Sequence, residues 1–213
     1  MRLIVGMSGA SGVIYGIRLL EILQSMPDIQ THLVLSPAAR QTITLETDRS
    51  PHDVEAVADV CHRFRDIAAA PSSGSFHTDG MIVVPCSMRT LSGIAISAND
   101  NLLVRAADVT LKERRRLVIV PRETPLHLGH LRLMTQAAEI GAVICPPAPA
   151  FYNRPSTLDE MVDYTVHRLL DLFGVRVPGQ DGRRWSGPEP AVPDQTGWDG
   201  GQSLQSHSVP IHH

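Results

Sequence analysis

Short apolar segments alternate along the chain with segments in which apolar residues recur every three or four positions. The short segments are rich in β-branched residues and lack a regular polar alternation, which is typical of strands buried on both faces of a sheet. Five such strands are expected, at residues 3–5, 32–35, 81–84, 117–120 and 142–145. Each is a candidate strand of one sheet.

The segments between these strands have the spacing of amphipathic helices. Three helices are expected, at residues 14–23, 54–61 and 158–173. Ser156 or Thr157 would cap the third, whose first turn is acidic. Alternating strands and helices predict a parallel sheet with helices on both faces. The expected fold is therefore α/β, a three-layer αβα sandwich with a Rossmann- or flavodoxin-like sheet.

Composition divides the 213 residues unevenly. The last 40 positions hold 7 Gly and 5 Pro, together with both tryptophans, Trp185 and Trp198. Residues 1–173 are therefore expected to form one folded domain, and residues 174–213 a tail that is partly ordered at most. Trp185 is a candidate lid over the active site or strap to a neighbouring subunit.

Charge and cysteine content exclude several classes of protein. The formal net charge is −3 and only 4% of residues are aromatic, so neither a basic surface nor a stacking platform for nucleic acid is indicated. Three widely spaced cysteines form no CxxC pair, which argues against a zinc site and a disulfide framework. The sequence has neither a signal-peptide pattern nor an apolar run long enough to span a bilayer. A reducing cytoplasm is the expected location.

Polar residues follow the predicted strands. Ligands of open α/β sheets bind beyond the carboxyl ends of the strands, which meet at one edge. The segments that follow the five strands are 8–12, 36–37, 85–90, 121–123 and a run of prolines and alanines that ends at Phe151 and Tyr152. Hydroxyls, glycines, two arginines and one carboxylate are therefore expected to form one site.

The first of these turns, residues 8–12, reads SGASG and opens directly into a helix. Its N–H groups favour a phosphate, and Ser8 or Ser11 could add a hydroxyl donor. The turn is neither GxGxxG nor a Walker A loop, so a nucleotide with a single phosphate fits it better than a dinucleotide or a triphosphate. The alternative is an ordinary tight turn that uses Gly for its backbone freedom.

Two further turns carry candidate chemistry. Ser87 and Thr90 flank a helix start with Arg89 between them, so Ser87 is either an ordinary N-cap or, with the other two, a second set of donors for the same ligand. Arg122 and Glu123 follow a central strand, where an Arg suits anion binding and a Glu suits proton transfer.

Tyr152 and Arg168 could together hold a second anion, or they could simply pack on a loop and extend over a helix surface. Among the ten histidines, His127 and His130 form the one suggestive pair, and no ligand spacing is present. No metal is assigned.

As a set, the motifs MSGASG, PCSMRTLSGIA, RAADVTLKERRRLVIVPRE and PPAPAFYNRP resemble the UbiX/Pad1-like flavin prenyltransferases. The resemblance covers about residues 1–173 and is strongest to the branch named after the second subunit of hydroxyarylic (phenolic) acid decarboxylases. It implies transfer of the dimethylallyl group of dimethylallyl phosphate to N5 and C6 of reduced FMN. The product, prenylated FMN, would serve a partner decarboxylase of the UbiD type, and the chain would form a homo-oligomer, a dodecamer in the family.

The resemblance also implies residue roles. Glu123 would be the general acid/base, with Lys112 and Ser11 assisting. Dimethylallyl phosphate would be bound by Tyr152 and Arg168, by Lys112, and by Arg105 from across a subunit interface. The positions that match the FMN-binding residues of the family are Gly9, Ala10, Ser11, Ser36, Ser87, Met88, Arg89, Thr90 and Arg122.

Two other functions compete with this one. The strand-end anion site alone would suit a flavin-binding accessory subunit without catalysis of its own. A flavin-dependent decarboxylase acting directly on a small acid is the other alternative, as in the related cysteine-decarboxylase flavoproteins. Glu123, Tyr152 and Arg168 argue for the prenyltransferase, because a carrier needs no acid/base group and no second anion site.

Overall fold

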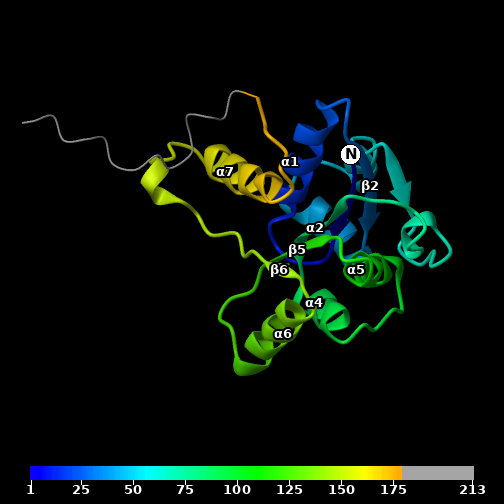
Figure 1. Ribbon diagram of the computed structural model, residues 1–213. Coiled ribbons are helices and arrows are strands. Elements are labelled where there is room, and N and C mark those ends of the chain that lie inside the picture. Colours follow the sequence, from blue (N-terminus) through cyan, green and yellow to red (C-terminus); the bar gives the residue numbers. More distant parts are fainter. Residues whose placement is uncertain (179–213) are drawn as a thin grey trace, which may run out of the picture.

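A parallel β-sheet forms the centre of the protein in a computed structural model that describes residues 1–178 (Figure 1). Its strand order is β3-β2-β1-β4-β5-β6, the order of the doubly wound dinucleotide-binding folds. Every pair of neighbouring strands is parallel. The strands are β1 (Arg2–Met7), β2 (Gln30–Leu35), β3 (Val60–His62), β4 (Gly80–Cys86), β5 (Arg116–Pro121) and β6 (Val143–Ile144).

Helices cover both faces of the sheet. α1 and α7 lie on one face and α4, α5 and α6 on the other (Figure 1). The α-helices are α1 (Val13–Gln24), α2 (Pro37–Glu46), α3 (Pro51–Glu55), α4 (Met88–Ala95), α5 (Leu102–Lys112), α6 (Leu128–Glu139) and α7 (Leu158–Asp171). Two short 3-10 turns, η1 (Ala70–Ser72) and η2 (Phe151–Asn153), lie in the longer connections.

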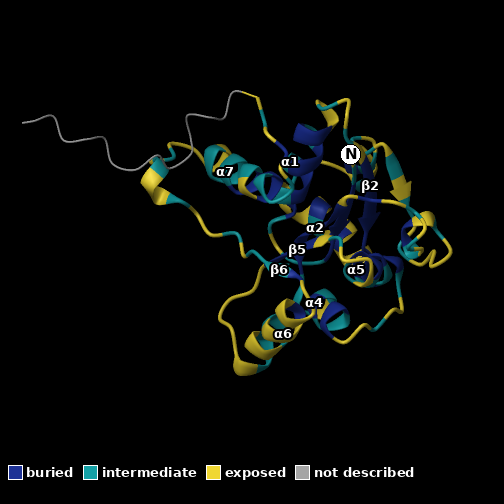
Figure 2. Cartoon of the chain, viewed as in Figure 1, coloured by how far each residue is buried: buried dark blue, intermediate teal, exposed yellow. Residues whose placement is uncertain are grey.

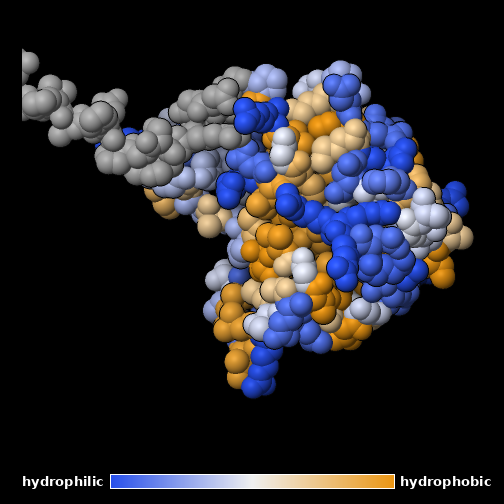
Figure 3. Space-filling model, in the orientation of Figure 1, coloured by the Kyte–Doolittle hydropathy of each residue, from blue (hydrophilic) through white to orange (hydrophobic). Residues whose placement is uncertain are grey.

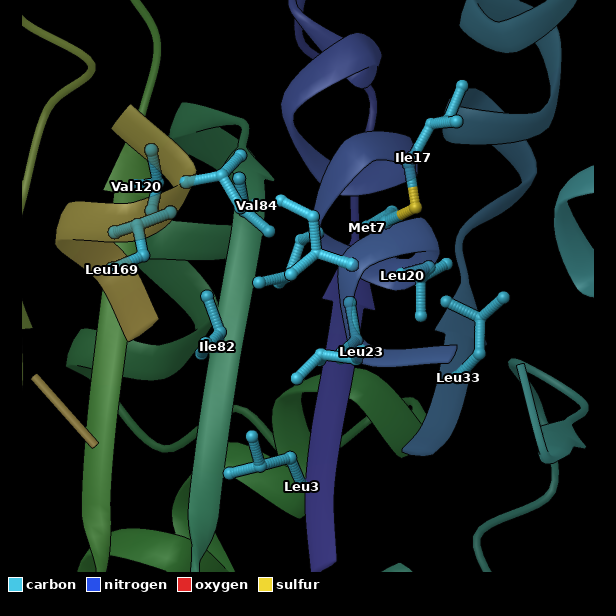
Figure 4. Close-up of a cluster of buried hydrophobic side chains, with 14 of the residues drawn as sticks. Leu3, Met7, Ile17, Leu20, Leu23, Leu33, Ile82, Val84, Val120 and Leu169 are labelled. Carbon is cyan, nitrogen blue, oxygen red and sulfur yellow. The ribbon is translucent and has the colours of Figure 1, made fainter. Parts of the chain in front are cut away.

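The sheet separates two hydrophobic clusters. Along β1, Leu3 and Val5 belong to the cluster under α1 and α7, whereas Ile4 points to the cluster under α4 and α5. Figure 4 shows the first cluster, in which Leu20 of α1 and Leu169 of α7 lie over the strands. Burial of one such side chain stabilises the fold by about 1.5–3 kcal/mol, so this alternation holds the strand ends in place.

Most of the expected elements are confirmed. The five predicted strands correspond to β1, β2, β4, β5 and β6, and the helices predicted at residues 14–23 and 158–173 correspond to α1 and α7. Thr157, one of two candidate caps, caps α7 by accepting a hydrogen bond from the N–H of Glu160. The three-layer α/β sandwich is therefore confirmed.

The helix expected over residues 54–61 is wrong beyond Glu55, because the chain turns there and forms the edge strand β3. The Asp59 carboxylate accepts hydrogen bonds from the N–H (2.7 Å) and the hydroxyl (2.9 Å) of Thr31 on β2. This holds the chain against β2, where His32 Nδ1 lies 2.9 Å from His62 Nε2. A strand of three residues is too short to show a period of its own.

The folded body continues past residue 173. Val175 is buried and its N–H donates to the carbonyl of Leu170. From residue 179 onward the predicted tail, Trp185 included, lies outside the described residues.

Candidate active site

The carboxyl ends of β1 and β4 are joined by one buried side chain, Ser8. Its N–H and hydroxyl both donate to the carbonyl of Pro85, at 3.1 and 3.2 Å, and its hydroxyl accepts from the N–H of Ser87 at 2.8 Å. The helices after β1 and β4 leave on opposite faces, so this is the switch point of the sheet, where open α/β sheets bind ligands. Of the two candidate hydroxyl donors in this turn, Ser8 and Ser11, Ser8 therefore uses its hydroxyl proton within the fold.

The turn after β1 is shaped by close packing. A Cβ added at Gly9 would lie 2.3 Å from the Cβ of Ala38 in α2, so only glycine fits there. Gly12 has φ +97°, a left-handed conformation that favours glycine. Ser11 is exposed. The turn thus needs its glycines for geometry, as the alternative interpretation held.

Glu46, at the last turn of α2, reaches the N-terminus of α1. Its Oε2 accepts from the N–H of Gly12 at 2.8 Å and of Val13 at 3.2 Å. A carboxylate is favourable at that positive helix end. Sequence reasoning missed this residue, since it lies 34 positions beyond Gly12 and belongs to no local motif.

A cavity of about 840 Å³ opens beside the switch point. Among the residues assigned to FMN, five line it: Gly9, Ser36, Ser87, Arg89 and Thr90. Its other walls include Phe64, Ile67, Ile96, Asn101 and Val104. Segments far apart in the sequence thus share one concave surface, of a size typical for small-molecule sites.

Two helices begin at this cavity. The Ser36 hydroxyl caps α2 by accepting from the N–H of Ala39 at 3.0 Å. The Ser87 hydroxyl caps α4 by accepting from the N–H of Thr90 at 3.3 Å and lies 3.2 Å from the Thr90 hydroxyl. Ser87 is therefore an N-cap and also lines the cavity. Two positive helix ends and three hydroxyls make this surface favourable for a phosphate.

Arg122 and Glu123 are exposed at the end of β5, and neither lines the cavity. Burial raises the pKa of Tyr15 and the nearby charge of Arg122 opposes that rise, which places Arg122 near the first turn of α1. The Glu123 carboxylate accepts from the N–H of Thr124 at 3.0 Å. Both residues directly follow β5, the strand beside β4, and so lie at the predicted edge of the sheet.

Tyr152 contacts the helix that carries Arg168 through a third residue, Tyr164, and Arg168 itself pairs with Asp171 at 3.7 Å. The hydroxyls of Tyr152 and Tyr164 are hydrogen-bonded, and their rings are perpendicular at 6.1 Å. Arg168 follows Tyr164 by one helical turn on α7. Burial raises the pKa of Cys145, just past β6, and the charge of Arg168 opposes that rise, so Arg168 lies near the carboxyl end of β6. Tyr164 was not predicted, because a single Tyr on a helix carries no motif.

Lys112 and Arg105 lie elsewhere in this protomer. Lys112 ends α5, at the amino edge of the sheet, and pairs with Glu113. Arg105 donates to the carbonyl of Ser72 at 3.2 Å and to Asp108 at 3.0 Å. Neither lines the cavity. A role for them in the site requires a neighbouring subunit and stays a prediction.

The histidine pair has a structural explanation. His127 caps α6, since its Nδ1 accepts from the N–H of Gly129 at 3.0 Å and of His130 at 3.4 Å. Within residues 1–178, no three His, Cys, Asp or Glu side chains are grouped as a metal ion requires. Burial raises the pKa of the Cys86 thiol to about 12, so a thiolate nucleophile is not available at the end of β4.

None of the helices within the described part of the chain is both long and apolar enough to cross a bilayer.

Comparisons with known proteins agree with this geometry. The model of the family named Flavoprotein matches residues 1–169. The flavin prenyltransferase UbiX of Escherichia coli K12 is 64% identical over 186 residues, which cover 87% of this chain and 98% of that protein.

Two solved structures superpose closely, each with a TM-score of 0.84 and each covering 88% of this chain. One is described as a dodecameric FMN-dependent UbiX-like decarboxylase from Escherichia coli O157:H7, with 53% identity and 100% of that chain covered. The other is AnUbiX (PadA1) in complex with FMN and dimethylallyl pyrophosphate, with 49% identity and 98% covered.

Proposed function

The chain belongs to the Flavoprotein family and, within it, to the UbiX flavin prenyltransferases, and we propose that it transfers the dimethylallyl group of dimethylallyl phosphate to reduced FMN. One observation carries the proposal. Three sets of candidate residues follow neighbouring strands at one edge of the sheet. The cavity residues lie beyond β1 and β4, Glu123 lies beyond β5, and Tyr152 and Arg168 belong to the segment that follows β6. The reaction joins two substrates that each carry a phosphate and moves protons between them, so it needs two anion-binding sites and one acid/base group.

The cavity suits FMN. Two helix N-termini and the hydroxyls of Ser36 and Thr90 provide donors for one phosphate, Ser87 orients the Thr90 hydroxyl by donating to it, and Arg89 adds a positive charge. Apolar walls such as Phe64 suit a flat ring system. When bound, reduced FMN supplies the nucleophilic N5 and C6 atoms. Gly9 lets the backbone approach closely, and the resemblance adds Ala10, Ser11, Met88 and Arg122 to the FMN-binding set.

The phosphate of the prenyl donor is held by Tyr152 and Arg168. A hydroxyl donor and a guanidinium fork stabilise the negative charge that grows on the phosphate as its bond to the allylic carbon breaks. Lys112 and Arg105 join them from a neighbouring subunit.

Glu123 moves the protons, as general acid toward the leaving phosphate and as general base toward the flavin. Glu123 follows β5, the strand between β4 and β6, and this order of strands supports a role between the two phosphate-binding groups. The N–H of Thr124 orients its carboxylate. Proton transfer of this kind contributes about a hundred- to ten-thousandfold in rate.

The product, prenylated FMN, serves a UbiD-type decarboxylase in the cytoplasm, and the enzyme works as a homo-oligomer. Helix α6 supports association, because Ala137 is its one buried residue while Leu128 (60%) and Leu131 (47%) are exposed (Figure 2). Figure 3 shows hydrophobic residues along the outer edge of this helix. The relative of known structure described above is dodecameric.

The test is anaerobic incubation with reduced FMN and dimethylallyl phosphate, followed by mass spectrometry of the flavin. A gain of one five-carbon prenyl unit is expected. An unchanged flavin mass would contradict the proposal and leave an accessory flavin-binding role. Because one relative is described as a decarboxylase, release of CO2 from a phenolic acid is assayed in parallel, and none is expected from this chain alone.

A further inference from the structure

We propose that Tyr164 is a positioning residue of the prenyl-donor site. Its hydroxyl holds the hydroxyl of Tyr152 on the face of α7 that carries Arg168 one turn further on, so that Tyr152 directs its own O–H to the phosphate of the donor. This inference rests on the proposed function, in which Tyr152 and Arg168 bind that phosphate. Tyr164 acts through Tyr152 rather than by contact with the substrate.

The segment that carries Tyr152 lies along one ridge of α7. The N–H and hydroxyl of Ser156 donate to Glu160 Oε2, at 2.7 and 2.9 Å. Tyr152, four residues before Ser156, is hydrogen-bonded to Tyr164, four residues after Glu160. Glu160, Tyr164 and Arg168 are spaced by four positions and therefore share a helix face. The loop is thus attached to the ridge by successive contacts that lead toward Arg168.

The two tyrosines differ in how firmly they are held. Tyr152 lies on η2 and is 52% exposed. Tyr164 is half-buried on α7, directly before Thr165 and Val166, which pack into the core. The helix side chain is therefore anchored by the fold, and the loop side chain takes its position from it. A rigid element that orients a loop residue reduces the entropy lost when the substrate binds.

A tyrosine hydroxyl can donate one hydrogen bond while it accepts another. With Tyr164 donating to the Tyr152 oxygen, Tyr152 donates its own proton to a phosphate oxygen. The hydrogen bond with Tyr152, together with burial, raises the pKa of Tyr164, so Tyr164 keeps the proton that this chain of bonds needs. Successive hydrogen bonds polarise one another, which strengthens the bond to the phosphate.

Phenylalanine at position 164 keeps the ring and removes only the hydroxyl. Loss of one such hydrogen bond, worth about 0.5–1.5 kcal/mol, corresponds to roughly a two- to twelvefold change in binding. We therefore expect Tyr164→Phe to raise the KM for dimethylallyl phosphate about fivefold, with kcat and the affinity for FMN changed less than about twofold.

The experiment is a double-mutant cycle with Tyr152→Phe, Tyr164→Phe and the double variant, in which kcat, KM and the Kd for FMN are measured on the full chain. Thermal unfolding checks that each variant folds. The expected result is that Tyr164→Phe raises KM in the wild-type background and has no further effect once Tyr152→Phe is present.

The other outcomes distinguish a failure of the positioning role of Tyr164 from a failure of the proposed donor site. If Tyr152→Phe raises KM and Tyr164→Phe does not, the positioning role is wrong and the donor site stands. If Tyr164→Phe raises KM equally in both backgrounds, it acts by packing and not through Tyr152, which also overturns the inference. If Tyr152→Phe leaves KM unchanged, the donor-site assignment in the proposed function fails.

Discussion

The two halves of the candidate active site are built differently. The flavin half, at the ends of β1, β2 and β4, consists of backbone groups, helix caps and the buried Ser8. The donor half, beside β5 and β6, consists of side chains that reach into solvent: Glu123, Tyr152 and Arg168 are all exposed. The first half is held by hydrogen bonds at the strand ends, whereas the second is joined by side-chain contacts on the surface.

The difference has a functional reason. A flavin must be held in one orientation, and groups fixed by the core of the sheet achieve this at little entropic cost. The donor site must bind a small phosphate ester, release phosphate and admit a neighbouring subunit, which suits exposed side chains on a loop and a helix. Substitutions in the donor half should therefore change turnover or KM, and substitutions in the flavin half should change stability and FMN affinity.

The largest effect is expected at Glu123 in the donor half, where a substitution should lower turnover without weakening the binding of FMN. Glu123→Gln should lower kcat about a hundred- to ten-thousandfold, because the amide cannot carry the proton. FMN affinity should stay within about twofold, as measured by flavin fluorescence titration. Glu139→Gln, an exposed glutamate at the end of α6, is the matched control. Full turnover by Glu123→Gln would remove the residue from its assigned role.

Arg168 tests whether the donor half acts independently of the flavin half. Arg168→Met should raise the KM for dimethylallyl phosphate roughly ten- to a hundredfold, because charge-assisted hydrogen bonds are worth about 1.5–3 kcal/mol. The Kd for FMN should be unchanged. Arg176→Met serves as the control, since Arg176 is exposed beyond α7. A parallel loss of FMN affinity would show that the two halves are not separate.

Ser8 tests the opposite behaviour in the flavin half. Ser8→Ala leaves the N–H of Ser87 without its acceptor, which should cost about 1–3 kcal/mol of stability in chemical denaturation. FMN affinity should fall about tenfold, since Ser87 and the start of α4 lose their support. Thr44→Ala, which removes an exposed hydroxyl bonded only within α2, should change neither quantity. Unaltered stability of Ser8→Ala would contradict the bridging role.

The smallest effect concerns the pH dependence of stability and arises on β2, the strand that precedes Ser36. Burial, with the charges of His62 and Arg2, lowers the pKa of His32 on β2 to about 4, against the smaller opposing effect of Asp59. Between pH 6.5 and 4 the His32 imidazole is protonated in the unfolded chain and neutral in the folded chain. The free energy of unfolding should therefore fall as the pH decreases through this window. Below about pH 4, His32 should cause no further change.

Thermal unfolding between pH 7 and 4 measures this dependence. The stability of His32→Leu should depend less on pH than that of the wild type, because the variant lacks a histidine whose pKa is lowered by folding. His52→Asn, at an exposed histidine in α3, should follow the wild-type curve. Identical slopes for His32→Leu and the wild type would show that His32 does not carry the effect. His62, whose pKa burial also lowers, contributes in the same direction and remains in every variant.

The fold could be predicted because long strands and helices carry strong periodic patterns. β1 and β4 are buried almost throughout, and α7 has a clear apolar face. The prediction failed at β3, where three residues take their structure from pairing with β2 and from the contact between Asp59 and Thr31. No local pattern reports such a contact.

In the candidate site, too, residues that act through long-range contacts could not be predicted from local sequence patterns. Ser36 and Ser87 could be predicted because each follows a recognisable strand and caps a helix, and Thr90 because it lies in the first turn after Ser87. Glu46 and Tyr164 could not, because each meets its partner only after folding. Ser8 or Ser11 was expected to donate to a ligand, and the burial of Ser8 between β1 and β4 could not be predicted from the SGASG turn.

The sequence by itself determined the class of fold, the sheet edge where the site lies and, through the combined motifs, the family and its chemistry. Alternating apolar segments encode these features locally, since each strand and helix must bury one side of itself. Only the tertiary structure decided which hydroxyls line the cavity and which are committed elsewhere. It also decided that Glu46 meets the start of α1 and that Tyr164 meets Tyr152. Those pairings depend on how separate elements pack, and the packing is a property of the whole fold.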